Sequence, residues 1–359
     1  MYNFLRKADP EKLLAPLFKR ASDLFGINEE VIVCLDTSSI EKPHSTMMEN
    51  IAKVIRSDKK GTVNGFTLIS GIAVSGKKRA LVCHRVFSRE TDSYISDNKE
   101  HEAEVARARE ILDRQGIIWN ADRLYDSWFF IDLFLQNGDH FVIRAGKNRR
   151  VKVVGMKEEV NLLDWAMRLS PSSASYVKVK KQNKRAKLEL SWGQFLYRGK
   201  VLNLVKARLS CFRNPLILIT DLRVKDADEA MRVYEIYSMR WAVEDYFKFM
   251  KECLGSDSFQ VRSWQSIQSL SSITALTGGY IYSLGAEADN KVILLIAKLG
   301  AWSGLKNHRP GKKVITRGLM WLMVSVSVDE ELDRLRVDKQ KLWRAIMWGT
   351  DNPDEIFKR

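Results

Sequence analysis

The sequence predicts a mixed α/β protein, and three observations support that class. Short apolar runs rich in β-branched residues, typical of buried strands, begin near Val31, Ile117 and Leu216. Stretches with helical periodicity lie between them. The order along the chain, three strands expected to be antiparallel followed by alternating helix and strand, indicates a mixed sheet.

The first half of the chain is predicted to build most of this sheet. A strand over 31–35 should end at Asp36, which opens the polar turn Asp-Thr-Ser-Ser. The segments 65–74 and 80–87, joined by a turn at 75–78, are expected to form a hairpin beside it. A helix over about 100–115 then leads into a strand over 117–121 that delivers Asp122. A helix over 127–136 and a strand over 141–144 follow.

The composition changes between Trp165 and Thr220. This stretch carries a single acid, Glu189, against twelve basic residues: Arg168, Lys178, Lys180, Lys181, Lys184, Arg185, Lys187, Arg198, Lys200, Lys206, Arg208 and Arg213. Polar and apolar residues alternate in its centre, which predicts a small antiparallel insertion. Trp192 and Tyr197 lie within it, and aromatic residues among cations favour stacking on an unpaired or flipped base. Packing within the sheet is the simpler interpretation of either ring.

The last third is predicted to complete the sheet and then to be helical. A strand at 216–220 returns to the core, and a helix begins at about Lys225. Helices are expected over 264–273, 288–299 and 330–347. We therefore divide the chain into a short N-terminal segment (1–30), the first part of the core (31–150), the basic β-rich insertion (151–213), the second part of the core (214–262) and a helical C-terminal region (263–359).

Charge and cysteine usage narrow the class of function. The 359 residues carry a formal charge of +15, which favours an anionic partner, most commonly nucleic acid. A membrane surface is the competing polyanion, but the sequence shows no apolar stretch of transmembrane length and no signal peptide, so we expect a cytoplasmic protein. The four cysteines are scattered and form no zinc motif. Any catalytic metal is therefore expected to have oxygen ligands, which favours Mg²⁺ or Mn²⁺.

Four polar residues near position 244 form the most informative pattern. Tyr237, Arg240, Glu244 and Lys251 are spaced three, four and seven apart, which places them on one stripe of a helix, and Lys248 joins the same stripe. One carboxylate among several cations suits a metal ion together with a nucleic-acid backbone. The alternative is a solvated helix face on which Glu244 pairs with Arg240 and Lys248.

Three carboxylates are candidates for one metal site. Asp36 and Asp122 each follow a predicted core strand, and Glu244 lies on a later helix. Phosphodiester chemistry with two divalent ions requires oxygen ligands that converge from separate elements. Each aspartate alone is equally compatible with a turn or a helix cap.

The chain resembles the DDE transposases of bacterial insertion sequences, specifically the group related to insertion sequence four. That group's signature, Y-x-x-R-x-x-x-E-x-x-x-x-x-x-K, is matched by the four polar residues of the predicted helix. The resemblance extends to Leu35-Asp-Thr37 with the nearby Glu41-Lys-Pro, to Ala121-Asp-Arg123 and to Phe141-Val-Ile-Arg144, and covers about 31–261. It implies a ribonuclease-H-like mixed sheet flanked by helices, with a β-rich insertion between the second aspartate and the glutamate.

The resemblance also implies an activity and its residues. The enzyme would cut and join DNA with two Mg²⁺ or Mn²⁺ ions held by Asp36, Asp122 and Glu244. Its partners would be double-stranded DNA, at the element ends and at the target, and a second copy of the chain in a synaptic complex. A hairpin intermediate is typical of relatives, and the enzyme would be nucleoid-associated when on DNA. The expected DNA-binding residues are Tyr237, Arg240, Lys248, Lys251, Arg123 and Trp192.

Two departures from the family pattern define the alternatives. Relatives carry a DNA-binding region before the first aspartate, whereas about 35 residues precede Asp36 here. A truncated, non-catalytic DNA-binding remnant or inhibitor of transposition is therefore one alternative, and a ribonuclease-H-like host nuclease is another. Relatives often have glycine or glutamate where this chain has Leu124, so Asp126 and Asp132 are further candidates for the second ligand.

Overall fold

The computed structural model describes residues 2–179, 184–287, 290–301 and 310–334. The chain divides into two compact units, 1–286 and 287–359, and each is described by itself. The finer five-part division remains a prediction. Among the described residues, no helix is long and apolar enough to cross a membrane.

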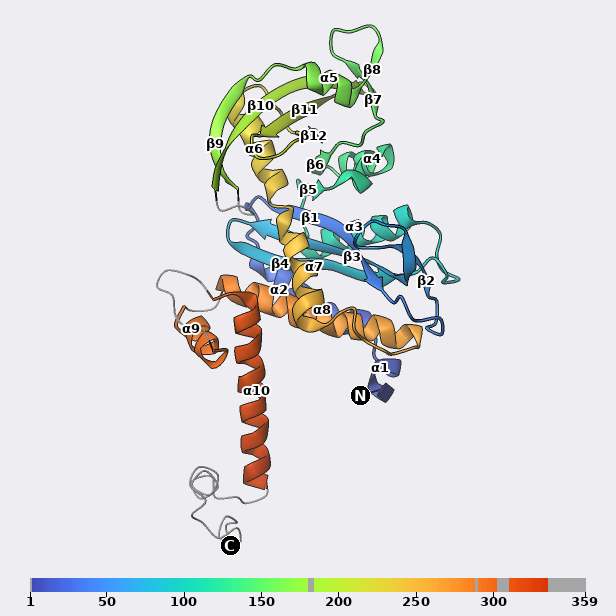
Figure 1. The fold of residues 1–359 in the computed structure, drawn as a ribbon, viewed down its shortest axis with the longest axis vertical. Helices are drawn as coiled ribbons and strands as arrows, with labels where there is room; N and C mark the ends of the chain where they lie inside the picture. Colours follow the sequence, from blue (N-terminus) through green and yellow to red (C-terminus); the bar gives the residue numbers. More distant parts are fainter. Residues whose placement is uncertain (1, 180–183, 288–289, 302–309, 335–359) are drawn as a thin grey trace. The chain divides into compact units, whose positions relative to one another are not determined.

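The first unit is a mixed α/β sheet flanked by helices, which confirms the predicted fold class (Figure 1). Its described strands form one twelve-stranded sheet in which β2-β3-β1-β5-β6-β12-β11-β10-β7-β8 are successive neighbours, while β4 pairs with β3 and β9 with β10. The strands are β1 (Ile32–Glu41), β2 (Ala52–Ile55), β3 (Thr62–Ser75), β4 (Lys78–Phe87), β5 (Ile118–Ala121), β6 (His140–Arg144), β7 (Arg150–Val153), β8 (Glu159–Asn161), β9 (Ser173–Val179), β10 (Lys184–Tyr197), β11 (Lys200–Leu209) and β12 (Leu216–Thr220).

Strand β1 is longer than the sequence predicts. The expected strand ends at Leu35, but the polar residues after it continue the strand to Glu41. The reason is the long partner strand β3, which pairs antiparallel with β1 from Ile32↔Val74 to Glu41↔Gly65. Asp36 therefore lies inside a strand and not in a turn. On its other side β1 pairs parallel with β5, and β5 pairs parallel with β6.

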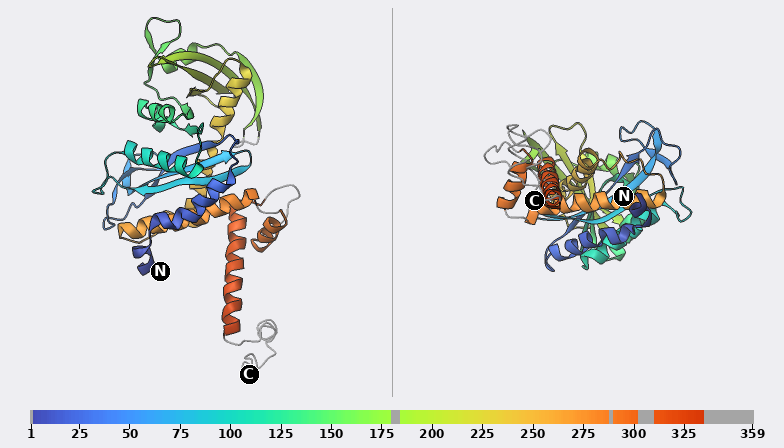
Figure 2. Two further views of the ribbon diagram at one scale, coloured as in Figure 1. Left: turned by 180° about the vertical axis from the view of Figure 1, so that it is seen from behind. Right: turned by 90° about the horizontal axis from the view of Figure 1, so that it is seen from below.

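Helices cover both faces of the sheet. The helices of this unit are α1 (Tyr2–Lys7), α2 (Pro10–Leu24), α3 (Asp97–Leu112), the 3-10 turn η1 (Arg123–Tyr125), α4 (Trp128–Gln136), α5 (Leu162–Arg168), α6 (Ala227–Ser238), α7 (Trp241–Leu254) and α8 (Trp264–Glu287). Helices α3 and α4 pack on one face, and α6 and α7 pack on the other. Helices α2 and α8 lie side by side, and Gln265 and Ser269 of α8 both donate to the carbonyl of Ala8 (Figure 2).

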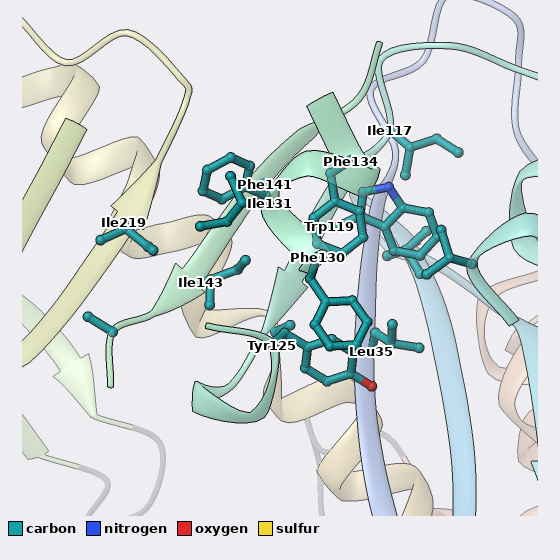
Figure 3. Packing of buried hydrophobic residues seen from close by; sticks show 14 of the residues in the cluster. Leu35, Ile117, Trp119, Tyr125, Phe130, Ile131, Phe134, Phe141, Ile143 and Ile219 are labelled. Atoms are coloured by element: carbon teal, nitrogen blue, oxygen red, sulfur yellow. The ribbon is translucent and has the colours of Figure 1, made fainter. Parts of the chain in front are cut away.

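Large apolar side chains fill the face beneath α4. Trp119 of β5 stacks on Phe134 of α4 with ring centroids 5.3 Å apart, and Phe130 lies against Tyr125 beside them (Figure 3). All four rings are fully buried, or nearly so. Since burying one such side chain contributes roughly 1.5–3 kcal/mol, this cluster fixes α4 and the carboxyl end of β5 together.

The predicted helix around position 244 is interrupted. Helix α6 ends at Ser238 and α7 begins at Trp241, so Tyr237 belongs to α6 and Arg240 is the residue that precedes α7. Between them the hydrogen bonds tighten to three-residue spacing, from the Arg240 amide to the Tyr237 carbonyl (3.0 Å) and from the Val243 amide to the Arg240 carbonyl (3.2 Å). The expectation of one continuous stripe is wrong in this respect.

The second unit contains helices α9 (Asn290–Leu299) and α10 (Lys312–Arg334). The helices approach closely at two glycines: a Cβ on Gly318 would collide with the Ile296 carbonyl oxygen, and one on Gly300 would collide with the Val314 carbonyl oxygen. The predicted helix over 330–347 overlaps only the end of α10, and its remainder lies outside the described residues.

Candidate active site

Neighbouring parallel strands bring the two aspartates together. The register of β1 and β5 pairs Leu35 with Ala121, so Asp36 and Asp122 are the next residues along adjacent strands. Neither has the local role that the sequence left open: Asp36 lies within β1, and the Asp122 side chain makes no capping hydrogen bond to η1. Helix α7 crosses β1 on the same face and contributes Glu244 from its first turn.

Arg240 lies between the carboxylates. Its Nη1 is 3.0 Å from Asp36 Oδ2, and its Nη2 is 2.5 Å from Glu244 Oε1. The side chains are 12% exposed for Arg240, 19% for Asp36 and 31% for Glu244. A second guanidinium, that of Arg144 at the end of β6, lies 4.0 Å from Asp122 Oδ1. Arg240 thus pairs with two of the three carboxylates, and Arg144 lies beside the third.

The electrostatics of this cluster favour an added cation. The pKa of Asp36 is raised to about 6, chiefly by burial and also by the neighbouring Asp122 and Glu244 charges, against the lowering effects of Arg240 and the Thr37 amide. Burial also raises the pKa of Tyr237, whose ring lies 5.5 Å from the Arg240 guanidinium. Asp122 Oδ1 is buried and has no hydrogen-bond partner among the described residues. Such an orphaned acceptor is costly unless a cation or donor satisfies it.

The donor set fits a hard divalent cation, although the carboxylates are not yet assembled around one. Carboxylate oxygens are the ligands that Mg²⁺ and Mn²⁺ prefer. Across the residues that the structure describes, no three acidic, histidine or cysteine side chains lie close enough to hold a metal ion. The guanidinium of Arg240 accounts for this, because it occupies the space between Asp36 and Glu244.

The expected DNA-binding residues are distributed unevenly around this cluster. Lys251 donates from Nζ to the backbone carbonyl of Ser39 at 2.8 Å, and burial lowers its pKa. Lys248 is exposed on α7 and lies 3.8 Å from Glu252, not beside Glu244. Arg123 is exposed directly after Asp122.

Trp192 lies on β10, a strand of the basic insertion and not one of the strands that lead to Asp36 and Asp122. It is half-buried, pairs in register with Val205 and packs against the core on the face that α6 covers. This is the environment expected for a packing residue. A role in stacking on a base stays a prediction.

The two further aspartate candidates are engaged elsewhere. Asp126 pairs with Arg149, both side chains being almost fully buried, and accepts a hydrogen bond from the Gly146 amide at 2.5 Å. Asp132 accepts from the Tyr197 hydroxyl at 2.5 Å and from Arg198 at 2.6 Å. Among the aspartates after β5, Asp122 is therefore the one beside Asp36.

Two residues near the site were not identified from the sequence. Arg144 could have been found, because it ends a predicted strand next to the one that delivers Asp122. No feature of the sequence indicated a role for Asn120. It is fully buried two residues before Asp122, and its side chain donates to the backbone of α6.

The fold and the acidic cluster define a class: a mixed α/β sheet of ribonuclease-H-like type, with aspartates on two neighbouring strands and a glutamate on a later helix. Residues 28–277 match the family described as "Transposase DDE domain", and the chain belongs to this family.

Comparison with solved structures supports the fold. The chain is similar to the piggyBac transposase in a cryo-EM structure of its synaptic complex with hairpin DNA, with a TM-score of 0.51 and 11% sequence identity. The match covers 100% of this chain and 67% of that one. At this identity the likeness shows the fold alone. A search of curated proteins found no match.

Proposed function

We propose that the protein is an active transposase of the group related to insertion sequence four, which cuts and joins DNA at the ends of its element. The observation that carries the proposal is the convergence of Asp36, Asp122 and Glu244 around Arg240. Family membership supports DNA transposition as the process, and the +15 charge suits a DNA partner.

The three carboxylates would hold two Mg²⁺ or Mn²⁺ ions. When bound, such ions activate a water or a 3′-hydroxyl for in-line attack and stabilise the leaving oxygen. The residues of the chain then have distinct tasks. Asp36, Asp122 and Glu244 would hold the ions, and Arg240 would exchange its carboxylate partners for a phosphate, where its charge would stabilise the negative oxygens of the pentacoordinate transition state.

The other basic residues would position DNA. Lys251 lies on α7 and Tyr237 on α6, the two helices that meet at the acidic cluster, and Arg123 and Lys248 are exposed cations available to phosphates. The basic strands of the insertion would extend this contact, with Trp192 as the candidate for base stacking. The neighbouring piggyBac structure is a synaptic complex with hairpin DNA, which supports the proposals of a hairpin step and of a dimer that joins two DNA ends.

The test compares two single substitutions on the same helix. The substrate is a duplex that carries the DNA flanking this gene, with Mn²⁺ or Mg²⁺ present. Glu244→Gln should abolish cutting while leaving duplex binding intact, because glutamine lacks the negative charge of the metal ligand but has nearly the same size and shape. Glu252→Gln, at a more exposed glutamate two turns further along α7, should cut like the wild type.

Each outcome assigns the function differently. Cutting at a defined position by the wild type and by Glu252→Gln, but not by Glu244→Gln, supports the transposase. Retained cutting by Glu244→Gln overturns it. If none of the proteins cuts but all shift the duplex in low salt, the non-catalytic DNA-binding alternative replaces it. Cutting without preference for the flanking sequence favours the host nuclease.

A further inference from the structure

The break between α6 and α7 is bound to the sheet by side chains from the same two strands that carry the aspartates. Asn120 of β5 donates from Nδ2 to the carbonyl oxygen of Ile236, and the same nitrogen lies 3.5 Å from the Tyr237 carbonyl oxygen. Cys34 of β1 donates from Sγ to the carbonyl oxygen of Met239 at 3.2 Å. Both side chains are fully buried.

The register explains why these anchors stand beside the acids. Cys34 and Asn120 are paired across β1 and β5, and Asn120 Nδ2 lies 3.7 Å from Cys34 Sγ. Residues two apart on a strand project from the same face. On β1, Cys34 is therefore followed on the same face by Asp36. Asn120 of β5 is followed in the same way by Asp122, which comes directly after the strand and keeps an extended backbone.

The anchored segment is the one that orients the site. Met239, whose carbonyl Cys34 binds, directly precedes Arg240. One turn later comes Glu244, which Arg240 contacts. A shift or rotation of this segment relative to β1 and β5 would therefore move Arg240 and Glu244 together, away from both aspartates.

Asn120 is not explained by packing. It lies among apolar residues of the core, and its own Oδ1 has no hydrogen-bond partner among the described residues. A buried amide with an unsatisfied oxygen costs free energy that a leucine of similar volume would not. What the asparagine provides is a second hydrogen bond to carbonyls at the end of α6, one that comes from the sheet and adds to those from the Met239 and Arg240 amides.

We propose that Asn120 is a positioning residue for DNA cleavage: through its bond to the end of α6, assisted by Cys34, it fixes Arg240 and Glu244 against Asp36 and Asp122. The residue is fully buried and is not among the proposed metal or DNA ligands. The cleavage part of this inference rests on the proposed transposase function, whereas the anchoring of the α6–α7 break does not.

The chain offers a matched control for a structural effect. Asn203 of β11 is also a buried asparagine whose Nδ2 donates to a backbone carbonyl, that of Leu222 at 2.8 Å. Asn120→Leu and Asn203→Leu therefore both remove an amide-to-carbonyl bond from the core, and only the first removes it from the α6–α7 break. Asn203→Leu also removes the bond that Asn203 Oδ1 accepts from Gln194, so it is the more severe test of a general loss of stability.

Two measurements on each variant separate anchoring from general stability. The first is hydrogen exchange of the backbone amides of 236–246, followed by mass spectrometry. Asn120→Leu should speed it by about fivefold, since one buried hydrogen bond contributes about 1 kcal/mol and its loss releases the end of α6 from β5. Asn203→Leu should leave it unchanged. The second is the single-turnover cleavage rate, which should fall about 100-fold in Asn120→Leu with duplex affinity unchanged, the scale expected for a displacement near 1 Å.

A milder pair of variants decides the case if Asn120→Leu does not fold. Cys34→Ala removes the donor to the Met239 carbonyl, and Cys34→Ser restores a hydroxyl donor of similar size. Faster exchange over 236–246 in Cys34→Ala, and its return toward the wild-type rate in Cys34→Ser, supports the anchoring. Equal exchange in the two variants contradicts it.

The outcomes distinguish this inference from the proposed function. If exchange over 236–246 and the cleavage rate change equally in Asn120→Leu and Asn203→Leu, Asn120 is an ordinary core residue and the inference is overturned. If the wild type does not cut DNA, the transposase function fails and the positioning role in cleavage fails with it, whereas the exchange data still decide whether Asn120 anchors the break.

Discussion

Replacing Arg240 with glutamine should destabilise the metal-free protein and make its stability depend on divalent cations. The guanidinium and the carboxylates it contacts are all less than one-third exposed. Removing one partner from a buried ion pair costs about 3–5 kcal/mol, because the remaining charge is left uncompensated. Since Glu244 keeps some access to water, we expect about 2–4 kcal/mol, which corresponds to a fall in melting temperature of about 3–7 °C for a unit of this size.

Divalent cations should reverse this loss. In Arg240→Gln the carboxylates are free to bind Mg²⁺ without displacing a guanidinium. A ligand at 100 times its dissociation constant stabilises a protein by about 2.7 kcal/mol, so millimolar Mg²⁺ should restore most of the lost stability. Adding Asp36→Asn to Arg240→Gln should also recover part of it, because one of the repelling charges is removed.

The assay is thermal unfolding followed by circular dichroism, in EDTA and in 10 mM Mg²⁺. The control is Arg232→Gln on α6, which breaks an exposed pair with Glu30 and should cost less than about 1 kcal/mol under either condition. The reasoning is refuted if Arg240→Gln unfolds in EDTA at the wild-type temperature, or if Mg²⁺ stabilises the wild type as much as the variant.

Further predictions concern a buried histidine, the choice of the second aspartate and one lysine. Burial lowers the pKa of His84 to about 3, so its contribution to stability is complete above pH 6.5 and is lost as the pH falls toward 3. In urea unfolding His84→Gln should reduce the pH dependence over that range by up to about 1.4 kcal/mol per pH unit, and an unchanged slope would contradict this. Asp126→Asn should destabilise by about 3–5 kcal/mol because it strands the buried Arg149, whereas Asp122→Asn should cost less than about 1 kcal/mol. The reverse order in chemical denaturation would reassign the second ligand. Lys251→Met should lower the slope of log affinity for duplex against log salt by about 0.9, the value for one lost phosphate contact. An unchanged slope would mean that Lys251 contacts no phosphate and only binds the Ser39 carbonyl of β1.

The fold class was predictable because the apolar runs of the sequence are the segments that the fold buries. The runs that begin near Val31, Ile117 and Leu216 became strands β1, β5 and β12, since β-branched residues flanked by turns have few other buried conformations. The apolar side of α7 was also predictable: Ala242, Val243 and the residues one and two turns later are buried. The conformation of these elements is determined mainly by residues close to one another in the sequence.

Features that depend on distant partners were not predictable. The extension of β1 beyond Leu35 is imposed by β3, and the break before α7 coincides with carbonyls that Asn120 and Cys34 bind from more than 100 residues away. The pairing of Arg240 with Glu244 was one of the sequence's alternatives, and the structure confirms it. The structure adds Asp36 as the second partner, which four-residue spacing cannot reveal.

The path of the chain around β6 and β12 has a consequence for how such proteins diversify. These two strands are hydrogen-bonded neighbours, with Leu218 opposite Arg144, and the Ala145 amide donates to the Ile217 carbonyl at 2.8 Å. The roughly seventy residues between them continue the same sheet beyond β12, which pairs with β11, and place Phe195 and Leu202 in the core. The strands of this segment lie on the side of β12 away from β1 and β5, so the turns that join them can change in length without moving Asp36 and Asp122. Under the proposed function, contacts to new DNA sequences can evolve in those turns while the acidic residues stay in place.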